Sequence, residues 1–403
     1  MSILFGHPTG NPNSHHAALA HFESNRLEAF CVPWMPASWE LKSLQLIPGL
    51  QNWVARLQRR SFAPLTEARI IQGRLGEWKR MLQRIAGNGT SGEGLSYEAN
   101  DWLMRTMTRE CVRDGVTAVH SYEDCSLWQF EEARRRGLAC IYDLPIGYYP
   151  AWEKTQLRLA DEFRDWMPRE GAGSSRFVRP EQKRREMEIA DVVLAPSDFV
   201  RSTVFKYSNK KVELAPYGID SFFWKPGEGP APERFRFLCA GQLSIRKGTP
   251  LLLKAWRAAE IKDAELHLVG SWQLAEVRKS DLPPNCFYSG PVSREQLREH
   301  YGKANVFVLP TYFEGRALVG GEAMACGLPI LTTPASGLTD MIDDSCGRIF
   351  ECGNRDALIE QLRWFVAHAR EVEQMRMAAR RKAEQFTWEK YRAAVSQAVS
   401  SYV

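Results

Sequence analysis

Short apolar runs alternate with longer amphipathic segments along most of the chain. The first half contains ILFGHP, TAVHSY, ACIYDLP, DVVLAPS and VELAPYG, and the second half contains FRFLCAG, ELHLVGS, CFYSG, VFVLPT and PILTTP. Each run has about the length of a buried strand, several end in Gly, Pro or Ser, and most precede a helical pattern. This alternation predicts an α/β protein with doubly wound parallel sheets, covered by helices on both faces.

A segment rich in Pro and Gly, FFWKPGEGPAPER, separates the two groups of predicted strands. The helical pattern stops there and a new strand begins, so we expect a first domain over 1–217 and a second domain over 218–385. A chain of 403 residues is long enough for two hydrophobic cores. Two such sheets that face each other would bring the carboxyl ends of their strands, where these sheets bind ligands, to a common cleft.

The region 36–110 departs from this alternation, because its pattern is helical and dense in Arg and Trp. It predicts a basic helical insertion between the first strands. A basic, aromatic amphipathic helix can lie in a membrane interface or bind an acidic acceptor. The same pattern also fits helices with a solvated basic face and a packed apolar face, so both interpretations stay open at this point.

Composition adds few constraints. Hydrophobic residues at 44% and charged residues at 25% are typical of a folded protein, and a net charge of +5 is a mild bias. The nine cysteines show no C-x-x-C pair or zinc-ligand spacing, which favours reduced thiols in a cytoplasmic protein. No apolar run has the length of a membrane span and the first residues do not resemble a signal peptide, so any membrane contact is expected to be peripheral.

Two glutamates eight positions apart stand out in EGRALVGGEAMACGLP. The pattern places Glu314 in a loop after a strand and Glu322 in the first turns of a helix that closes at Gly327. In one continuous helix the two would lie about 12 Å and about 80° apart, so we expect two contacts to one extended ligand. Backbone amides at a helix N-terminus also favour phosphate. The amides expected there are those of Gly315, Arg316, Ala317 and Leu318.

A second candidate phosphate site is AGQLSIRKG, a strand end followed by a loop that opens a helix. Arg246 and Lys247 would place positive charge beside free helix amides, close to Gly241 and Gln242. The alternative is a solvated helix start. The order Lys-Gly-Thr is not that of a Walker loop, and no G-x-G-x-x-G follows a strand, so a dinucleotide oxidoreductase is not indicated.

In the first half, HPTGNPNSHHAALAHF reads as a strand end, a loop and a helix. Gly10 and Asn11 could lie against a ligand there, while His15 and His16 could simply be polar residues at a helix start. His120 ends a predicted strand and is expected to face the cleft. A lone histidine is often structural, but this position makes it a candidate for acid–base chemistry.

Taken together, these motifs resemble the retaining glycosyltransferases of family 4, which have the two-domain GT-B fold. Glu314 and Glu322 match the E-x7-E signature of that family, and EAMACGLPI follows it almost unchanged. GQLSIRKG is similar to the Gly-Arg-Leu…Lys-Gly phosphate loop, and APYGID and ADVVLAPSDFV resemble strands near the domain junction. The segment 386–403 is similar to the terminal helix that crosses back to the first domain.

The resemblance implies a nucleotide-sugar donor, UDP- or GDP-linked, held mainly by the second domain. It implies that Glu322 binds the ribose, Lys247 the pyrophosphate and Glu314 the hydroxyls of the transferred sugar. Gly10 and Asn11 would face the pyrophosphate from the other domain. His120 would lie near the anomeric carbon, so His120, Glu314 and Lys247 are the implied catalytic residues. Helix amides and basic side chains would neutralise the leaving diphosphate, so no metal and no other cofactor is expected.

Two positions depart from the family pattern. Gln242 replaces the usual arginine of the phosphate loop, and Arg246 is a candidate substitute. Arg316 and Ala317 replace the common Phe-Gly. An inward Arg316 could favour an acidic sugar or compensate for Gln242, whereas an outward one would be a surface charge.

The function implied is transfer of a sugar to an acceptor hydroxyl with retention of anomeric configuration, in polysaccharide, glycolipid or glycoconjugate synthesis. The acceptor could be a glycan, a lipid-linked sugar or a small metabolite, and no nucleic-acid partner is expected. A second hypothesis is an inactive sugar-nucleotide-binding or scaffold protein of the same fold. A same-fold phosphorylase or epimerase is a third.

Overall fold

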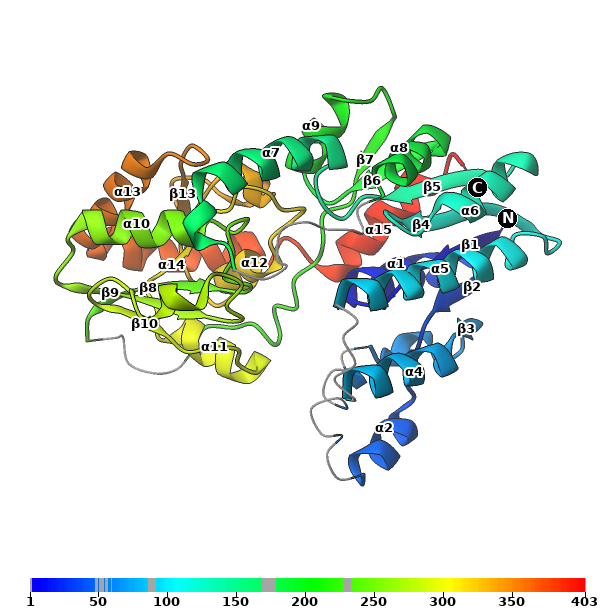
Figure 1. Cartoon of the computed structure of the whole chain (residues 1–403), viewed down its shortest axis with the longest axis horizontal. Helices are drawn as coiled ribbons and strands as arrows, with labels where there is room; N and C mark the ends of the chain where they lie inside the picture. Colours follow the sequence, from blue (N-terminus) through cyan, green and yellow to red (C-terminus); the bar gives the residue numbers. More distant parts are fainter. Residues whose placement is uncertain are drawn as a thin grey trace.

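Two α/β domains lie side by side in the computed structural model of the chain (Figure 1). The structure describes residues 2–402 except 48–49, 51–53, 55–56, 59, 86–91, 169–178 and 228–232. Each domain has its own parallel sheet with helices on both faces, as the alternation of apolar and amphipathic segments predicted. This confirms the α/β doubly wound fold class.

The first domain contains one sheet and the helices that cover it. Its strands are β1 (Ser2–Gly6), β2 (Leu27–Val32), β3 (Ile70–Gln72), β4 (Val116–Tyr122), β5 (Ala139–Asp143), β6 (Val192–Ala195) and β7 (Val212–Leu214). Its helices are α1 (Pro12–Glu23), α2 (Ser38–Gln45), α4 (Arg74–Ile85), α5 (Gly92–Glu110), α6 (Leu127–Arg135), α7 (Tyr149–Glu162), α8 (Pro180–Ile189) and α9 (Asp198–Phe205), with 3-10 turns at Ala63–Leu65 and Arg164–Trp166. The strand order is β3-β2-β1-β4-β5-β6-β7.

The second domain has a sheet of its own. Its strands are β8 (Phe235–Ala240), β9 (Ala264–Val269), β10 (Cys286–Tyr288), β11 (Val306–Leu309), β12 (Ile330–Thr332) and β13 (Gly347–Ile349). Its helices are α10 (Thr249–Ala259), α11 (Arg294–Gly302), α12 (Leu318–Ala325), α13 (Arg355–Ala367) and α14 (Ala369–Ala383), with 3-10 turns at Glu276–Lys279, Pro334–Ser336 and Thr339–Met341. The strand order is β10-β9-β8-β11-β12-β13. The order reverses between β8 and β11, so the loops after these two strands meet where doubly wound sheets bind ligands.

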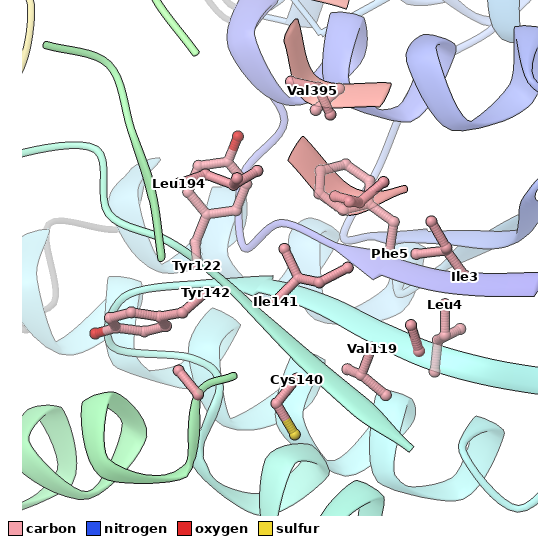
Figure 2. Close-up of a cluster of buried hydrophobic side chains, with 14 of the residues drawn as sticks. Ile3, Leu4, Phe5, Val119, Tyr122, Cys140, Ile141, Tyr142, Leu194 and Val395 are labelled. Carbon is pink, nitrogen blue, oxygen red and sulfur yellow. The ribbon is translucent and has the colours of Figure 1, made fainter. Parts of the chain in front are cut away.

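The last helix, α15 (Trp388–Val399), returns to the first domain and packs along α1 (Figure 1). Figure 2 shows Val395 on the same side of the first sheet as Phe5 and Tyr122, while Leu4 and Cys140 lie on the opposite side. These alternating directions follow the period of two in a strand. The C-terminal segment therefore completes the core of the first domain.

Two further segments join the domains. Tyr217 belongs to the core of the first domain, whereas Ile219 belongs to a core of the second. α7 starts beside the first sheet, but Leu159 near its end and the following Phe163 and Trp166 pack in the second-domain core (Figure 1). The chain therefore crosses between the domains at α7, at the 217–219 link and before α15.

The prediction of a helical insertion over 36–110 needs correction. β3 lies within this region and extends the first sheet, and α5 packs into the first core through Leu103, Met104 and Met107. Of the described helices in this region, α2 and α4 project from the sheet, at the lower edge of Figure 1. They share a small apolar cluster that consists of Trp34, Leu41, Leu44, Val54 and Leu57, with Leu50 and Trp78 packed against it.

Candidate functional site

Glu314 lies in the loop between β11 and α12, where it meets two cations from the loop after β8. Arg246 Nη1 and Lys247 Nζ each lie 2.8 Å from Glu314 Oε1. The Thr311 hydroxyl lies 3.4 Å from the same oxygen. The side chains of Glu314 and Lys247 are only 10% and 12% exposed, so these charges interact in a partly desolvated place. The structure thus brings three predicted site residues together, with one net positive charge.

The shape of the loop after β8 depends on Gly248. Its φ of 74° is left-handed, and a Cβ there would collide with the carbonyl oxygen of Pro310. Glycine therefore lets this loop approach the end of β11. Arg246 is fixed on the same side, because its guanidinium donates to the Phe313 carbonyl at 2.6 Å and its own carbonyl accepts from the Tyr312 amide at 2.9 Å.

The backbone amides of the β8–α10 loop do not have the predicted role. The Lys247 amide donates to the Ser244 hydroxyl, and the amides of Gly248 and Thr249 donate to carbonyls of Ile245 and Ser244. These three amides are therefore used within the loop. An anion at this place would meet the side chains of Lys247 and Arg246.

Gln242 is exposed, and Gly241 lies against the aliphatic end of Lys247. Arg246 is the cation that lies beside Lys247, and its role as a substitute for an arginine at position 242 remains a prediction.

The loop that carries Glu314 is seated against the first domain. A Cβ at Gly315 would collide with the carbonyl oxygen of Pro145, in the loop after β5. The Ser197 hydroxyl, at the start of α9, donates to the Gly315 carbonyl at 2.5 Å. The Ala317 amide donates to the Ser336 carbonyl at 3.0 Å, so the prediction that it faces a phosphate is wrong. The amides of Gly315, Arg316 and Leu318 remain candidates for that role.

Arg316 is neither an inward ligand group nor a surface charge. Its side chain is 1% exposed and lies over the ring of Phe386, with 4.6 Å between guanidinium carbon and ring centroid. Its Nη1 donates to both carboxylate oxygens of Asp340, at 2.9 and 3.0 Å, and to the Gly337 carbonyl. Both sequence-based interpretations are therefore wrong: Arg316 holds the 337–340 turn through its contacts with the Gly337 carbonyl and Asp340.

Replacement of Arg316 by methionine is expected to lower the free energy of unfolding by about 1–3 kcal/mol, since Asp340 and the Gly337 carbonyl lose a charged donor. Urea unfolding measures this change. A Gln242→Arg substitution in the same chain should not restore stability or activity, because Gln242 lies in a different loop and is exposed. Full restoration by Gln242→Arg would contradict the placement of Arg316.

Glu322 faces a cavity of about 590 Å³ between the two domains. The second domain contributes Arg294, Leu297, Leu318 and Glu322; the junction contributes Gly218, Ile219, Asp220, Trp224 and Trp388; the first domain contributes Pro12, His15, His16, Gln58, Ser61 and Phe62. This volume lies in the range of small-molecule sites. We call this cavity the cleft cavity, and we call Glu314 with Arg246 and Lys247 the Glu314 cluster. Residues 314–322 connect the two, because Glu314 belongs to the cluster and Glu322 lines the cavity.

The electrostatics of Glu322 reflect its burial. Desolvation raises its pKa to about 7, and the Asp220 carboxylate adds to this rise, whereas Arg294 and a hydrogen bond with Trp224 oppose it. Burial favours the neutral form of this carboxyl, and a pKa of about 7 means that both forms are populated near neutral pH. In either form, its oxygens can accept hydrogen bonds from ligand hydroxyl groups.

Aromatic side chains line the first-domain side of this cavity. The ring of His16 stacks on Trp388 at 4.3 Å, and that of His15 stacks on Phe62 at 5.1 Å. The sequence interpretation missed Trp388 and Phe62, as it missed Asp220 and Arg294. The cavity needs contributions from six separate segments, and no local pattern indicates that they meet.

The Gly10 and Asn11 loop borders this cavity through the next residue, Pro12. The Gly10 amide donates to His7 Nδ1 at 2.9 Å, and the Asn11 side chain caps α1 by accepting from the Ser14 amide. These groups hold the loop in shape, so contacts from Gly10 or Asn11 to a pyrophosphate remain a prediction.

His120 does not face the cleft, which corrects the prediction. It is 0% exposed, and its Nδ1 lies 2.9 Å from His21 Nε2 of α1. Its Nε2 lies 3.6 Å from the Asp143 carboxylate, and burial lowers its pKa to about 3. Strand parity directs this side chain toward α1 inside the first domain. A fully buried neutral imidazole cannot contact a sugar here, so we do not assign His120 to the reacting atoms.

None of the helices in the described ranges is long and apolar enough to cross a bilayer. Nor do three or more His, Cys, Asp or Glu side chains come together there as a metal site would require. The cysteines, all in described positions, are free thiols, and most of them are buried.

Comparison with known proteins supports these observations. Residues 220–382 match the family described as glycosyl transferases group 1. The chain is 27% identical over 221 residues to the MMP alpha-(1->4)-mannosyltransferase of Mycolicibacterium hassiacum, covering 52% of this chain and 53% of that one. It is 28% identical over 256 residues to a D-inositol 3-phosphate glycosyltransferase of Paenarthrobacter aurescens, covering 54% and 62%. These matches span less than two thirds of either relative.

Solved structures resemble the whole chain in fold. Sucrose-phosphate synthase from Thermosynechococcus elongatus superimposes with a TM-score of 0.67 at 18% identity, covering 100% of this chain and 98% of that one. Anabaena Alr3699/HepE in complex with UDP-glucose gives 0.63 at 13% identity, with all of both chains covered. Residues 220–382 therefore correspond to a group 1 glycosyltransferase domain, within a chain that has the GT-B fold.

Proposed function

We propose that this protein is a glycosyltransferase that moves a sugar from a nucleotide-sugar donor, UDP- or GDP-linked, to an acceptor hydroxyl with retention of anomeric configuration. The observation that carries the proposal is the pairing of two sites on residues 314–322. One is a carboxylate with two cations, and the other is a half-buried carboxyl in an interdomain cavity. Together they suit the hydroxyl-rich and anionic parts of one donor molecule. The group 1 match and the UDP-glucose complex of the Anabaena protein support it.

In this proposal, Glu322 accepts hydrogen bonds from the ribose, and Lys247 and Arg246 neutralise the diphosphate. Glu314 currently shares both cations, so an incoming diphosphate would draw them from it and leave its oxygens for sugar hydroxyls. As the glycosidic bond loosens, negative charge builds on the leaving diphosphate, where fixed cations lower the barrier. Seating of the 314–316 loop on the first domain would keep water from the sugar. The same cations would make a metal ion unnecessary.

The test is release of nucleoside diphosphate from a panel of UDP-, GDP- and ADP-sugars with candidate acceptors, with and without a chelator. We expect turnover of at least one donor, undiminished by chelator, and a product with the donor's anomeric configuration by NMR. Binding without turnover across all acceptors would favour the inactive sugar-nucleotide-binding alternative. Loss of activity with chelator would contradict metal independence, and inversion would contradict the family 4 assignment.

Donor affinity should increase as pH rises through 7. Ribose hydroxyls bind best to the ionised Glu322, whose pKa is raised to about 7, so the competent fraction falls about tenfold for each pH unit well below that value. Calorimetric titration of the nucleoside diphosphate between pH 5.5 and 8.5 measures this dependence. In Glu322→Gln the dependence should flatten. A profile shared by both proteins would show that another group titrates.

We propose that the acceptor is a glycan, a lipid-linked sugar or a small metabolite. We also propose that α2 and α4 bring the protein, in the cytoplasm, to the inner face of a membrane. Trp39 on α2, Leu46 directly after α2 and Leu75 on α4 are exposed, and exposed Lys42 and Lys79 lie on α2 and α4. Such a mixture suits an anionic lipid surface. Sedimentation with anionic vesicles should carry the protein down, and Leu46→Asp with Leu75→Asp should abolish this; unchanged sedimentation would contradict it.

A further inference from the structure

A second cavity, of about 400 Å³, lies against Tyr312 and Phe313, directly before Glu314 in sequence. Its described lining comes from both domains and shares no residue with that of the cleft cavity. The walls are Ala151, Lys154, Thr155 and Arg158 of α7, Phe199, Ser202 and Thr203 of α9, Lys206 and Tyr207 after it, and Tyr312 and Phe313. We call it the α7–α9 cavity.

The charge on this lining has one sign. Lys154, Arg158 and Lys206 contribute three cations, whereas the described lining residues include no acidic side chain. In the part of the chain that the structure describes, none of the three forms an ion pair, although the nearby Arg164 and Arg201 pair with aspartates. Lys154 and Arg158 are four residues apart on one helix face, an unfavourable pair of like charges unless an anion lies between them.

The remaining walls suit a small polar ring. Phe199, Tyr312 and Phe313 give aromatic surface, and Tyr207 at the rim is 41% exposed. The hydroxyls of Ser202 and Thr155 donate to carbonyls of their own helices but can still accept hydrogen bonds. A volume of about 400 Å³ is near the lower end of small-molecule sites. Cations beside aromatic faces and hydroxyls match a sugar ring with a phosphate group.

Tyr312 and Phe313 line the α7–α9 cavity and also contact Arg246 of the Glu314 cluster. Phe313 packs on Trp152 of α7 and Phe199 of α9, at ring distances of 5.2 and 5.3 Å. Its carbonyl accepts from Arg246, and the Tyr312 amide donates to the Arg246 carbonyl. A ligand that touches both α7 and Tyr312 would bind best when the 312–316 loop is seated on the first domain, and would therefore favour that state.

We propose that the α7–α9 cavity is a second ligand site, which takes a sugar phosphate or a similar small phosphomonoester and favours the seated 312–316 loop. The site is distinct from the donor cleft, and its occupancy does not depend on the function proposed above. Binding can therefore fail or succeed independently of glycosyl transfer.

The test uses glucose 6-phosphate as the probe in calorimetric titration of the full chain. The Lys247→Ala background is expected to weaken phosphate binding at the proposed donor site, so that binding at the α7–α9 cavity can be measured. We expect one site per chain, weaker binding of inorganic phosphate at the same site, and no binding of glucose. Lys154→Ala with Lys206→Ala should weaken binding at least tenfold, whereas the exposed Lys262→Ala should not change it, and Lys154→Arg with Lys206→Arg should keep most of it.

Lys154, Lys206 and Lys262 are exposed, so their variants are expected to fold. Thermal unfolding checks this for each variant, and for the Lys247→Ala background, whose lysine is largely buried. The proposal is overturned if glucose 6-phosphate does not bind at millimolar concentration. It is also overturned if glucose 6-phosphate binds the double alanine variant as tightly as it binds the protein that keeps Lys154 and Lys206. It is also overturned if glucose binds equally well, since phosphate would then not be recognised. Competition with anionic vesicles is measured as well. If the vesicles compete with glucose 6-phosphate, and glucose 6-phosphate binds no better than inorganic phosphate, the site binds a lipid headgroup. The proposal of a soluble ligand would then fail.

Discussion

Replacement of Lys247 by alanine is expected to lower kcat/KM for donor turnover by a factor of about 10²–10³, the usual effect of losing one fixed group that stabilises developing charge. Lys247 Nζ lies 2.8 Å from Glu314 and is largely buried, so no water-exposed cation can replace it without moving the loop. Removal also leaves Glu314 paired with Arg246 alone, which engages the second cation more tightly. Initial rates of nucleoside diphosphate release at varied donor concentration measure the loss.

Two further variants make the Lys247 result specific. Lys262→Ala removes an exposed lysine of the same domain outside both cavities, and its kinetics should match those of the unaltered chain. Lys247→Arg keeps the charge and should retain more activity than the alanine variant. A Lys247→Ala protein with unaltered turnover would show that the diphosphate does not bind at this loop.

Gly315→Ala is expected to reduce activity about 100-fold while leaving each domain folded. A Cβ at this position would collide with the Pro145 carbonyl oxygen, so the loop must withdraw from the first domain and carry Glu314 with it. The Ser197 hydrogen bond to the Gly315 carbonyl would weaken as well. A displacement of about 1 Å at the reacting centre can cost about 10² in rate. Steady-state kinetics with a saturating acceptor measure the effect.

The matched control for this substitution is Gly76→Ala. Gly76 lies in α4, and a Cβ there meets nothing within 4 Å. Alanine should therefore stabilise the exposed helix by up to about 1 kcal/mol and leave kinetics unchanged. If Gly315→Ala were as active as Gly76→Ala, seating of the 314–316 loop on the first domain would not be needed for turnover.

The fold was predictable because its signal is local. Alternating apolar runs and amphipathic segments fix strands and helices one at a time, and parallel sheets follow from that order. The proximity of Glu314 and Lys247 could also be predicted from the sequence. Each residue follows a strand, and the carboxyl ends of parallel strands lie at the same edge of a sheet. The same reasoning places Glu322 in the first turns of α12, where the structure has it.

Other features depend on partners far away in the sequence. Arg316 is buried because Asp340 and Phe386 cover it, and nothing near residue 316 indicates either contact. His120 stands near a strand end, as predicted, but its side chain turns toward His21 in α1. The walls of the cleft cavity depend on Trp388, which reaches the first domain only through the crossing helix.

The claim that Glu314 and Glu322 hold opposite ends of one donor is tested most directly by comparing two ligands on two variants. The ligands are the nucleoside diphosphate and the nucleotide sugar that turns over, titrated into Glu314→Gln and Glu322→Gln. Glu322→Gln should weaken both ligands by a similar factor, because the ribose is common to both. Glu314→Gln should weaken the nucleotide sugar relative to the diphosphate, because only the former has the transferred sugar. Equal effects of Glu314→Gln on both ligands, or none of Glu322→Gln on either, would contradict the account.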